Sequence, residues 1–212
     1  MRTRRASQRR GSALVFARRR CPGVAALIVS PKTNRMPNPR LSYEESCRRL
    51  QKDYLGDGVI PPLRDRLPRP DDEEPLGVSF FRTFVGEGDD LSNLFLPHTF
   101  FGRSEINNAV FRNTDFTESN LSWNDFVDVD FTDAVLAGSD MRASRFQRVR
   151  FVRTDLRRAD LRRSTFEGCT FEGALMQGAI LTQNQMDMMG LSTSQTHDVA
   201  WNADEGDEPD GG

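Results

Sequence analysis

The residue types that most often catalyse reactions or bind metals are sparse in this chain. Among its 212 residues are two histidines, His98 and His197, and three cysteines, Cys21, Cys47 and Cys169. No histidine and cysteine stand at a spacing typical of zinc ligands. The sequence also has no nucleophile elbow and no phosphate-binding glycine loop. We therefore expect no catalytic residue, no metal and no cofactor, and a protein that is not an enzyme.

The carboxylates have a regular place that argues against catalysis. Asp or Asn stands directly before a large apolar residue at Asp115, Asn120, Asp125, Asp130, Asp140, Asp155 and Asp160. A fixed place of this kind favours hydrogen bonds to the backbone at turns, which short carboxylate and amide side chains make readily. The elements that position these side chains therefore decide their role.

Those elements follow from a period of five. A large apolar residue occupies every fifth position: Leu96, Phe101, Ile106, Phe111, Phe116, Leu121, Phe126, Phe131, Leu136, Met141, Phe146, Phe151, Leu156, Leu161, Phe166, Phe171, Met176 and Leu181. A helix would spread these residues around its whole surface, because each such step turns it by ~500°. A strand would point alternate members to opposite faces. The chain must therefore turn a corner at about every fifth residue, which indicates a solenoid.

The repeats resemble a known family. The stretches TDFTESNLSWNDF, TDAVLAGSDM and TDLRRADLRRSTF are similar to the pentapeptide-repeat family, whose pattern is a small residue, Asp or Asn, Leu or Phe, and two variable positions. The resemblance covers the repeat region from Leu96 to Leu181. It implies an all-β solenoid: a right-handed quadrilateral β-helix of about four coils, with one pentapeptide on each of the four sides of a coil.

The remaining sequence predicts flanking segments. Residues 1–35 hold nine Arg, one Lys and no acid, and are expected to be a basic disordered arm, a targeting leader or the product of a mis-assigned start. Residues 36–95 are expected to form an N-terminal helix, a linker and a cap before the solenoid at 96–181. We expect a short capping helix at 182–191 and an acidic disordered tail at 192–212.

Two capping boxes mark the expected helices. Ser42 and Glu45 have the spacing at which each side chain satisfies a free amide of a helix start. Thr182 and Gln185 repeat this spacing after the solenoid, and Gly190 is placed to end the second helix.

Coils of four pentapeptides predict which side chains stack. Phe111, Phe131, Phe151 and Phe171 would form one internal column at a spacing of ~4.8 Å. An acidic coil would also lie over a basic one, with four pairs in register: Asp125 with Arg145, Asp128 with Arg148, Asp130 with Arg150 and Asp133 with Arg153.

The candidate partner-contact residues are those for which this stacking provides no partner within the coils. Five arginines have no acid in register and could leave a small basic patch: Arg142, Arg157, Arg158, Arg162 and Arg163. Asp155 and Asp160 are adjacent, however, and a solvated, internally neutralised face is the favoured interpretation. Trp123 joins them, because it stands at a variable, outward position. It is expected to pack on the N-terminal segment, to stack on Arg103 one coil earlier or to contact a partner. The acidic tail is a candidate to fold back onto the arginines that lack a partner.

Charge and composition narrow the function. The repeat region holds 11 basic and 12 acidic residues, so direct binding to nucleic acid is not expected. No apolar run reaches the ~18 residues of a membrane span, and three cysteines do not suit a disulfide-stabilised secreted domain. We predict a cytoplasmic, non-enzymatic scaffold that binds a protein partner and could form a homodimer through an end cap. The alternative is a DNA-mimicking protein that protects a topoisomerase such as gyrase, as some proteins of the resembled family do.

Overall fold

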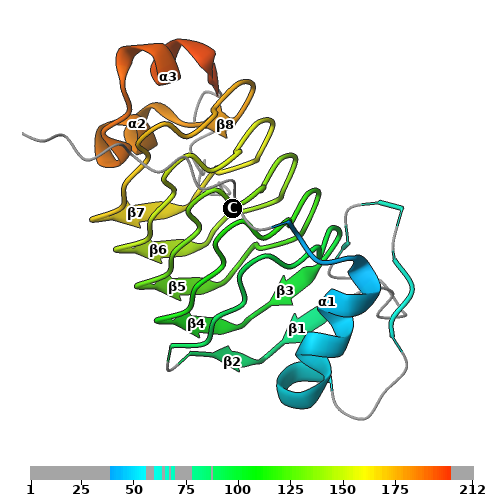
Figure 1. Cartoon of the computed structure of the whole chain (residues 1–212). Helices are drawn as coiled ribbons and strands as arrows, with labels where there is room; N and C mark the ends of the chain where they lie inside the picture. The colour runs from blue at the N-terminus through cyan, green and yellow to red at the C-terminus, as the bar shows by residue number, and fades with distance from the viewer. Residues whose placement is uncertain are drawn as a thin grey trace, which may run out of the picture. The chain divides into compact units, whose positions relative to one another are not determined.

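The described part of the chain is built on a stack of parallel β-coils (Figure 1). The computed structural model describes residues 39–55, 60–63, 65–66, 68–69, 78–86 and 88–201. All of them belong to the second of two compact units of the chain, Pro37–Gly212. The expectations for residues 1–35, for most of the linker and for the tail beyond 201 lie outside the described residues.

The strands of this fold are very short. A helix and a π-helical turn come first, α1 (Tyr43–Leu50) and η1 (Gln51–Leu55). The strands of the coils are β1 (Ser79–Phe81), β2 (Phe84–Val85), β3 (Phe100–Gly102), β4 (Glu105–Asn107), β5 (Asp125–Val127), β6 (Arg145–Gln147), β7 (Thr165–Glu167) and β8 (Ile180–Leu181). The described chain ends with α2 (Gln183–Met189), α3 (Thr193–Asp198) and β9 (Ala200–Trp201).

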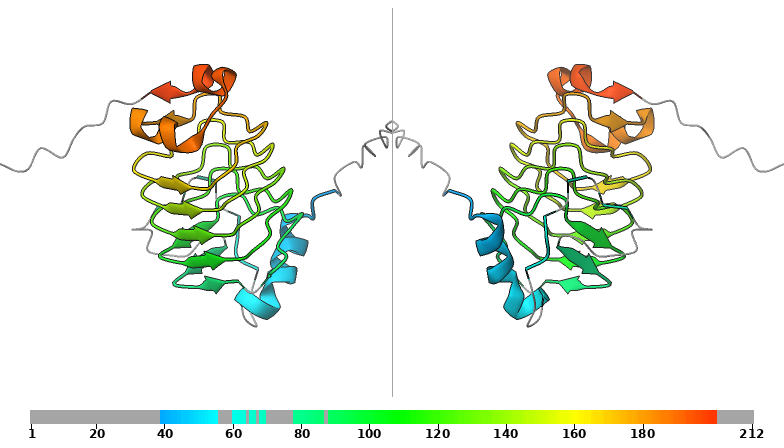
Figure 2. Two further views of the ribbon diagram at one scale, coloured as in Figure 1. Left: turned by 90° about the vertical axis from the view of Figure 1, so that its left-hand side faces the viewer. Right: turned by 90° about the vertical axis from the view of Figure 1, so that its right-hand side faces the viewer.

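Four sides of the coil are visible in the pairing register. One side is the parallel sheet of β2, β4, β5, β6 and β7, in which Ile106, Phe126, Phe146 and Phe166 pair in sequence at a constant step of one coil. The other three sides are rows of parallel bridges through Val110, Asp115 and Asn120, and each row repeats at the same step. The expected right-handed quadrilateral β-helix of about four coils is therefore confirmed for the repeat region (Figure 2).

Each side ends at a residue with left-handed backbone. Every fifth residue from Asn93 to Gly178 has a positive φ, between 50° and 69°. This residue always stands two positions after a large core residue. A non-glycine residue pays a steric penalty in this conformation, and Asn and Asp tolerate it best. The two variable positions of the repeat therefore differ in the residues that they tolerate. The second is a corner with left-handed backbone, and the first is not.

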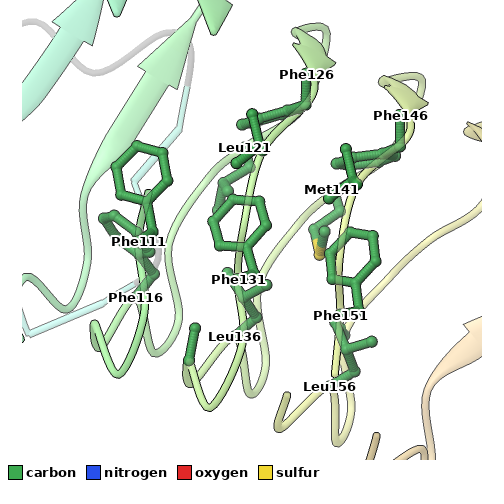
Figure 3. Close-up of a cluster of buried hydrophobic side chains, with 14 of the residues drawn as sticks. Phe111, Phe116, Leu121, Phe126, Phe131, Leu136, Met141, Phe146, Phe151 and Leu156 are labelled. Carbon is green, nitrogen blue, oxygen red and sulfur yellow. The ribbon is translucent and has the colours of Figure 1, made fainter. Parts of the chain in front are cut away.

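The core is a set of stacked side-chain columns. Phe111 and Phe131 stack with ring centroids 5.3 Å apart, and Phe131 and Phe151 stack at 5.6 Å (Figure 3). Phe151 and Phe171 continue the column at 5.0 Å. The predicted phenylalanine column is thus confirmed. Met141, which departs from the Leu or Phe of the repeat, is fully buried in the same core.

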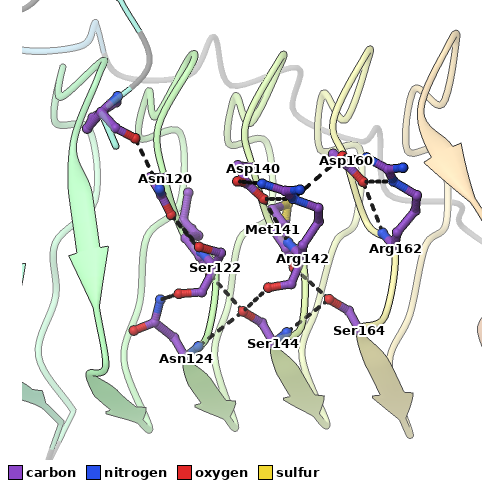
Figure 4. Close-up of polar contacts among 12 residues, drawn as sticks. Asn120, Ser122, Asn124, Asp140, Met141, Arg142, Ser144, Asp160, Arg162 and Ser164 are labelled. Carbon is purple, nitrogen blue, oxygen red and sulfur yellow. Dashed lines mark hydrogen bonds and ion pairs between the residues drawn. The ribbon is translucent and has the colours of Figure 1, made fainter. Parts of the chain in front are cut away.

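Small polar residues form a second internal ladder. The backbone amide of Ser104 donates to Asn124 Oδ1 at 2.7 Å, and the amide of Asn124 donates to Ser144 Oγ at 3.1 Å. The amide of Ser144 continues the ladder to Ser164 Oγ, also at 3.1 Å (Figure 4). These bonds satisfy buried amides that the short strands leave free.

The solenoid begins earlier than the sequence period suggests. Strands β1 and β2 pair with β3 and β4 one residue out of the regular step, with Ser79 opposite Phe100 and Phe84 opposite Glu105. Asp90 already pairs with Val110 in the regular register, so the additional residue lies between Val85 and Asp90. The boundary expected at residue 96 is therefore wrong. The additional residue breaks the period and hides the coil before it.

The N-terminal helix covers open groups of the first coil. Its capping box is present, because Glu45 N donates to Ser42 Oγ and Ser42 N donates to Glu45 Oε2. Ser46 Oγ then accepts a bond from the amide of Phe95 at 2.8 Å. Arg49 donates to the carbonyl of Ser92 at 2.9 Å. In later coils the equivalent amide and carbonyl groups bond to the backbone of the preceding coil. Helix α1 therefore replaces a preceding coil on this side of the solenoid.

The C-terminal cap is longer than expected. The side-chain oxygen of Gln185 accepts a hydrogen bond from the backbone amide of Thr182 and so caps α2. The side-chain nitrogen of Gln185 donates to the backbone carbonyl of Ser164 at 2.9 Å. Gln195 repeats this arrangement in α3 and donates to Phe171 O at 2.7 Å. The prediction that a disordered tail begins at residue 192 is therefore wrong for residues 192–201. A further Ser-x-x-Gln capping box starts α3 in this segment. As predicted, α2 ends at Gly190, whose φ is 58°.

Candidate partner-contact surface

Aspartates of the repeat hold the turns that orient the arginines. Asp140 Oδ1 accepts from the backbone amide of Arg142 at 3.1 Å, and Asp160 accepts from the amide of Arg162 at 3.2 Å. Each bond joins a side chain to the backbone two positions later, the geometry of an Asx turn. The prediction that these carboxylates stabilise corners is confirmed at both positions, and Asp155 does the same for Arg157.

The same aspartates neutralise three of the five arginines that have no acid in register. Arg142, Arg157 and Arg162 each form an ion pair with the aspartate two positions before, at 2.7, 2.6 and 2.6 Å. Arg142 also lies 3.7 Å from Asp160 of the next coil (Figure 4). These three arginines have no acid in register one coil away, and the structure shows that aspartates of their own turns neutralise them instead.

The stacked pairs between coils are largely as predicted. Asp128 binds Arg148 at 2.6 Å, Asp133 binds Arg153 at 2.7 Å, and Asp130 lies 3.8 Å from Arg150. The fourth pair is in register, with Asp125 opposite Arg145, but no ion pair joins its side chains in the described structure.

These contacts shift the pKa of several carboxyl groups. Burial alone would raise the pKa of Asp130, but hydrogen bonds from Thr132 and Arg112 outweigh it and lower that pKa. Burial also opposes the bonds from Arg157 at Asp155, where the net pKa is again lowered. At the exposed Asp128, the hydrogen bond from Arg148 lowers the pKa. All three groups are therefore held in their charged form.

Among the residues whose burial the structure describes, Trp123 is the most exposed aromatic residue. It stands at a left-handed corner with a φ of 58°, and 68% of its surface is exposed. No ring or cation–π contact involves it among the described residues. The expected stacking on Arg103 is not observed among the described residues, whereas packing on the N-terminal segment and contact with a partner stay predictions.

A groove runs along this corner because a small residue follows the tryptophan. One coil after Trp123 the corner carries Ala143, and the next carries Arg163. Two hollows of about 280 and 300 Å³ share these three residues. The first is completed by Arg142 and Arg162, and the second by Asn124, Asp125, Ser144, Arg145 and Thr165. We call this surface the Trp123 groove.

The six predicted contact residues thus separate into two places. Trp123, Arg142, Arg162 and Arg163 line one groove, whereas Arg157 and Arg158 stand at the preceding corner and line neither hollow. Arg158 and Arg163 have no ion pair within the described part of the chain.

Sequence reasoning missed two residues of the groove. It did not single out Ala143, although aligning successive coils places this small residue directly between Trp123 and Arg163. It also assigned Arg145 to an ion pair that does not form.

Other site types receive no support from the described residues. No group of three His, Cys, Asp or Glu side chains within them could hold a metal ion. No helix in this part of the chain is both long and apolar enough to cross a membrane.

The fold defines a class of repeat protein, the four-sided β-helix with pentapeptide sides. A family model described as "Pentapeptide repeat region" matches residues 99–181. This region of the chain belongs to the pentapeptide-repeat family.

Solved structures of the same kind are distant in sequence. One is HetL, a protein involved in heterocyst differentiation regulation from the cyanobacterium Nostoc sp. strain PCC 7120, with 15% identity and a TM-score of 0.42 over 50% of this chain. This chain covers 60% of that one. A thylakoid-lumen protein from Arabidopsis thaliana has 19% identity and a TM-score of 0.32, over 52% of this chain and 69% of its own.

A third structure is QnrB1, a plasmid-mediated fluoroquinolone resistance protein, with 13% identity and a TM-score of 0.31. The match covers 50% of this chain and 70% of QnrB1. No curated protein matches the chain significantly.

Proposed function

We propose that the solenoid is a non-enzymatic scaffold that binds a protein partner through the Trp123 groove. The observation that carries this proposal is the 68% exposure of Trp123 at a constrained corner. Corners elsewhere in the chain carry mostly Asn, Asp, Arg or Gly. A large aromatic side chain gains little from the coil at such a place, but it gives an interface much apolar area at a low cost in side-chain entropy.

The rigidity of the coil supports the same proposal. Trp123 and Arg163 are fixed two coils apart by the parallel register, and the paired arginines beside them are held by Asp140 and Asp160. A surface that is ordered before binding loses less entropy when a partner docks. A reducing compartment such as the cytoplasm fits the proposal, because Cys47 and Cys169 are free thiols.

The experiment compares two corner substitutions. Trp123→Asn replaces the aromatic ring with a residue that occupies the left-handed corner at Asn93, Asn108 and Asn113. Glu118→Asn is the control at the preceding, exposed corner, whose φ is 50°. Each variant and the unchanged chain would be used as bait in extracts of the native host.

We expect retention of one partner to fall with Trp123→Asn alone. Removing a tryptophan at the centre of an interface costs ~2 kcal/mol or more, a loss of about 30-fold in affinity. Titration with the purified partner measures this loss. Equal binding by all three proteins, or equal loss with both substitutions, would contradict the proposal.

The alternative of a DNA-mimicking topoisomerase protector is not favoured by the described surface. A mimic of DNA needs a continuous row of unpaired carboxylates. Six of the coil carboxylates are instead paired with arginines: Asp128, Asp130, Asp133, Asp140, Asp155 and Asp160.

A further inference from the structure

The Trp123 groove is positively charged where it is open. Its paired charges, Arg142 and Arg162 with Asp140 and Asp160, nearly cancel. The charges of the other side chains that line the two hollows do not cancel, and their sum is positive.

Arg163 and Arg145 line the groove, and neither has an ion pair among the described residues. Asp125 is the one further acid in the lining. Arg103, at the same corner one coil before Trp123, is exposed as well. The open part of the groove therefore combines a bare aromatic face with unneutralised guanidinium groups, which suits an acidic peptide segment.

The described chain ends on the side of the coil that leads to this groove. Strand β9 pairs in parallel with β8, with Trp201 opposite Leu181. Ile180 in turn follows Asp160, Asp140 and Asn120 in one row of bridges. Leu181 stacks over Leu161, Met141 and Leu121 of the earlier coils. In each of those coils the corner residue of the groove follows two positions later, as Arg163, Ala143 and Trp123. The segment that follows Trp201 therefore starts close to the corner that carries Arg163.

The remaining chain is long enough to reach the groove. Neighbouring coils lie ~4.8 Å apart, so Arg163 is two coils or ~10 Å from the level of Trp201, and Trp123 is four coils or ~19 Å away. The segment 202–212 spans up to ~36 Å when extended.

The composition of this segment matches the charge of the groove. Its sequence contains five acidic and no basic residues: Asp204, Glu205, Asp207, Glu208 and Asp210. A segment tethered by so short a connection has an effective concentration on the order of millimolar at a nearby site. An intrinsic dissociation constant of about 1 mM between the segment and the groove would therefore give about half occupancy.

We propose that the acidic segment 202–212 docks onto the Trp123 groove of its own chain, with carboxylates on Arg163 and Arg145 and backbone across Trp123. This docking requires no external partner, so it stands or falls separately from the scaffold function. Where both hold, the segment competes with the partner.

The test uses the fluorescence of Trp123 in the full-length chain. Trp201→Phe removes the other tryptophan, and thermal unfolding confirms that this background is folded. Acrylamide quenching is then compared with a variant whose five tail acids are changed to Asn or Gln, keeping the length of the chain. If about half of the molecules carry a docked tail, neutralising it raises the quenching constant of Trp123 about two-fold.

Two arginine variants locate the effect. Arg163→Gln should raise quenching by the same factor, and combining it with the neutral tail should add nothing further. Arg158→Gln is the matched control, because Arg158 is also an exposed corner arginine without an ion pair among the described residues, but lies outside the groove. It should leave quenching unchanged. Unchanged quenching with the neutral tail, or an equal response to Arg158→Gln, would overturn the proposal.

A cross-linking measurement in the unmodified background provides a second readout. A photoreactive residue in place of Glu205 should link to residues 120–145 or to Arg163 within the same chain. Links only to a second copy, or only to the cap at 182–201, would refute docking in the groove.

Discussion

Asp130 offers a direct test of how the corners are stabilised. Asp128 and Asp130 each face an arginine one coil later, but their side chains are 48% and 10% exposed. Asp130 also accepts from the amide of Thr132 at 2.9 Å and from Arg112 at 2.7 Å. We predict that Asp130→Ala destabilises the protein strongly, whereas Asp128→Ala has little effect.

The magnitude follows from what each substitution leaves behind. Asp130→Ala leaves the buried amide of Thr132 without a partner, which costs ~1–3 kcal/mol. It also removes a charge-assisted bond from the partly exposed Arg112, a smaller loss. We expect a total of ~2–3 kcal/mol. Asp130→Asn keeps an oxygen that can accept from the amide of Thr132. Its loss of unfolding free energy should therefore be less than half of that caused by Asp130→Ala.

The assay is urea unfolding of the three variants beside the unchanged protein. The midpoint should fall most for Asp130→Ala and least for Asp128→Ala, with similar slopes, because the surface exposed on unfolding is similar. An Asp128→Ala effect as large as that of Asp130→Ala would refute the argument from burial. Equal losses for Asp130→Asn and Asp130→Ala would show that charge, rather than the turn, stabilises the corner.

Three further outcomes follow from the same structure. Phe131→Ala should cost ~3–5 kcal/mol in urea unfolding, and Phe131→Leu much less, since Phe131 is fully buried between two stacked rings. The unfolding free energy should be largest above about pH 5 and fall as the pH drops below 4, because the folded pKa values of Asp128, Asp130 and Asp155 lie below their unfolded values; urea midpoints at pH 6 and pH 3 measure this. Gln195→Ala should speed amide exchange in α3 and β9 but not in β4, because it frees the carbonyl of Phe171 at one end of the stack.

Much of the fold could be predicted because one rule repeats along the chain. Each fifth residue has the same inward place, so the stacking of Phe111 on Phe131 and of Asp128 on Arg148 follows from arithmetic alone. The capping box at Ser42 and Glu45 is equally local, and it forms as expected.

The errors arise where the rule is interrupted or another contact competes. The first coil was missed because one additional residue between Val85 and Asp90 shifts its register. The register between coils does not predict the partners of Arg142 and Arg162, because these arginines bind aspartates two positions away in the same turn. Side-chain choices among nearby partners depend on the corner geometry, which the period does not encode.

The glutamine caps have a consequence for how copies of this protein meet. A parallel β-stack normally presents its last edge as a template for another chain, and repeated addition yields filaments. Here Gln185 and Gln195 occupy carbonyls of Ser164 and Phe171 with side-chain amides, while α2 lies against β7. An incoming strand would first have to displace two anchored helices, so polymerisation from this end is opposed within each monomer.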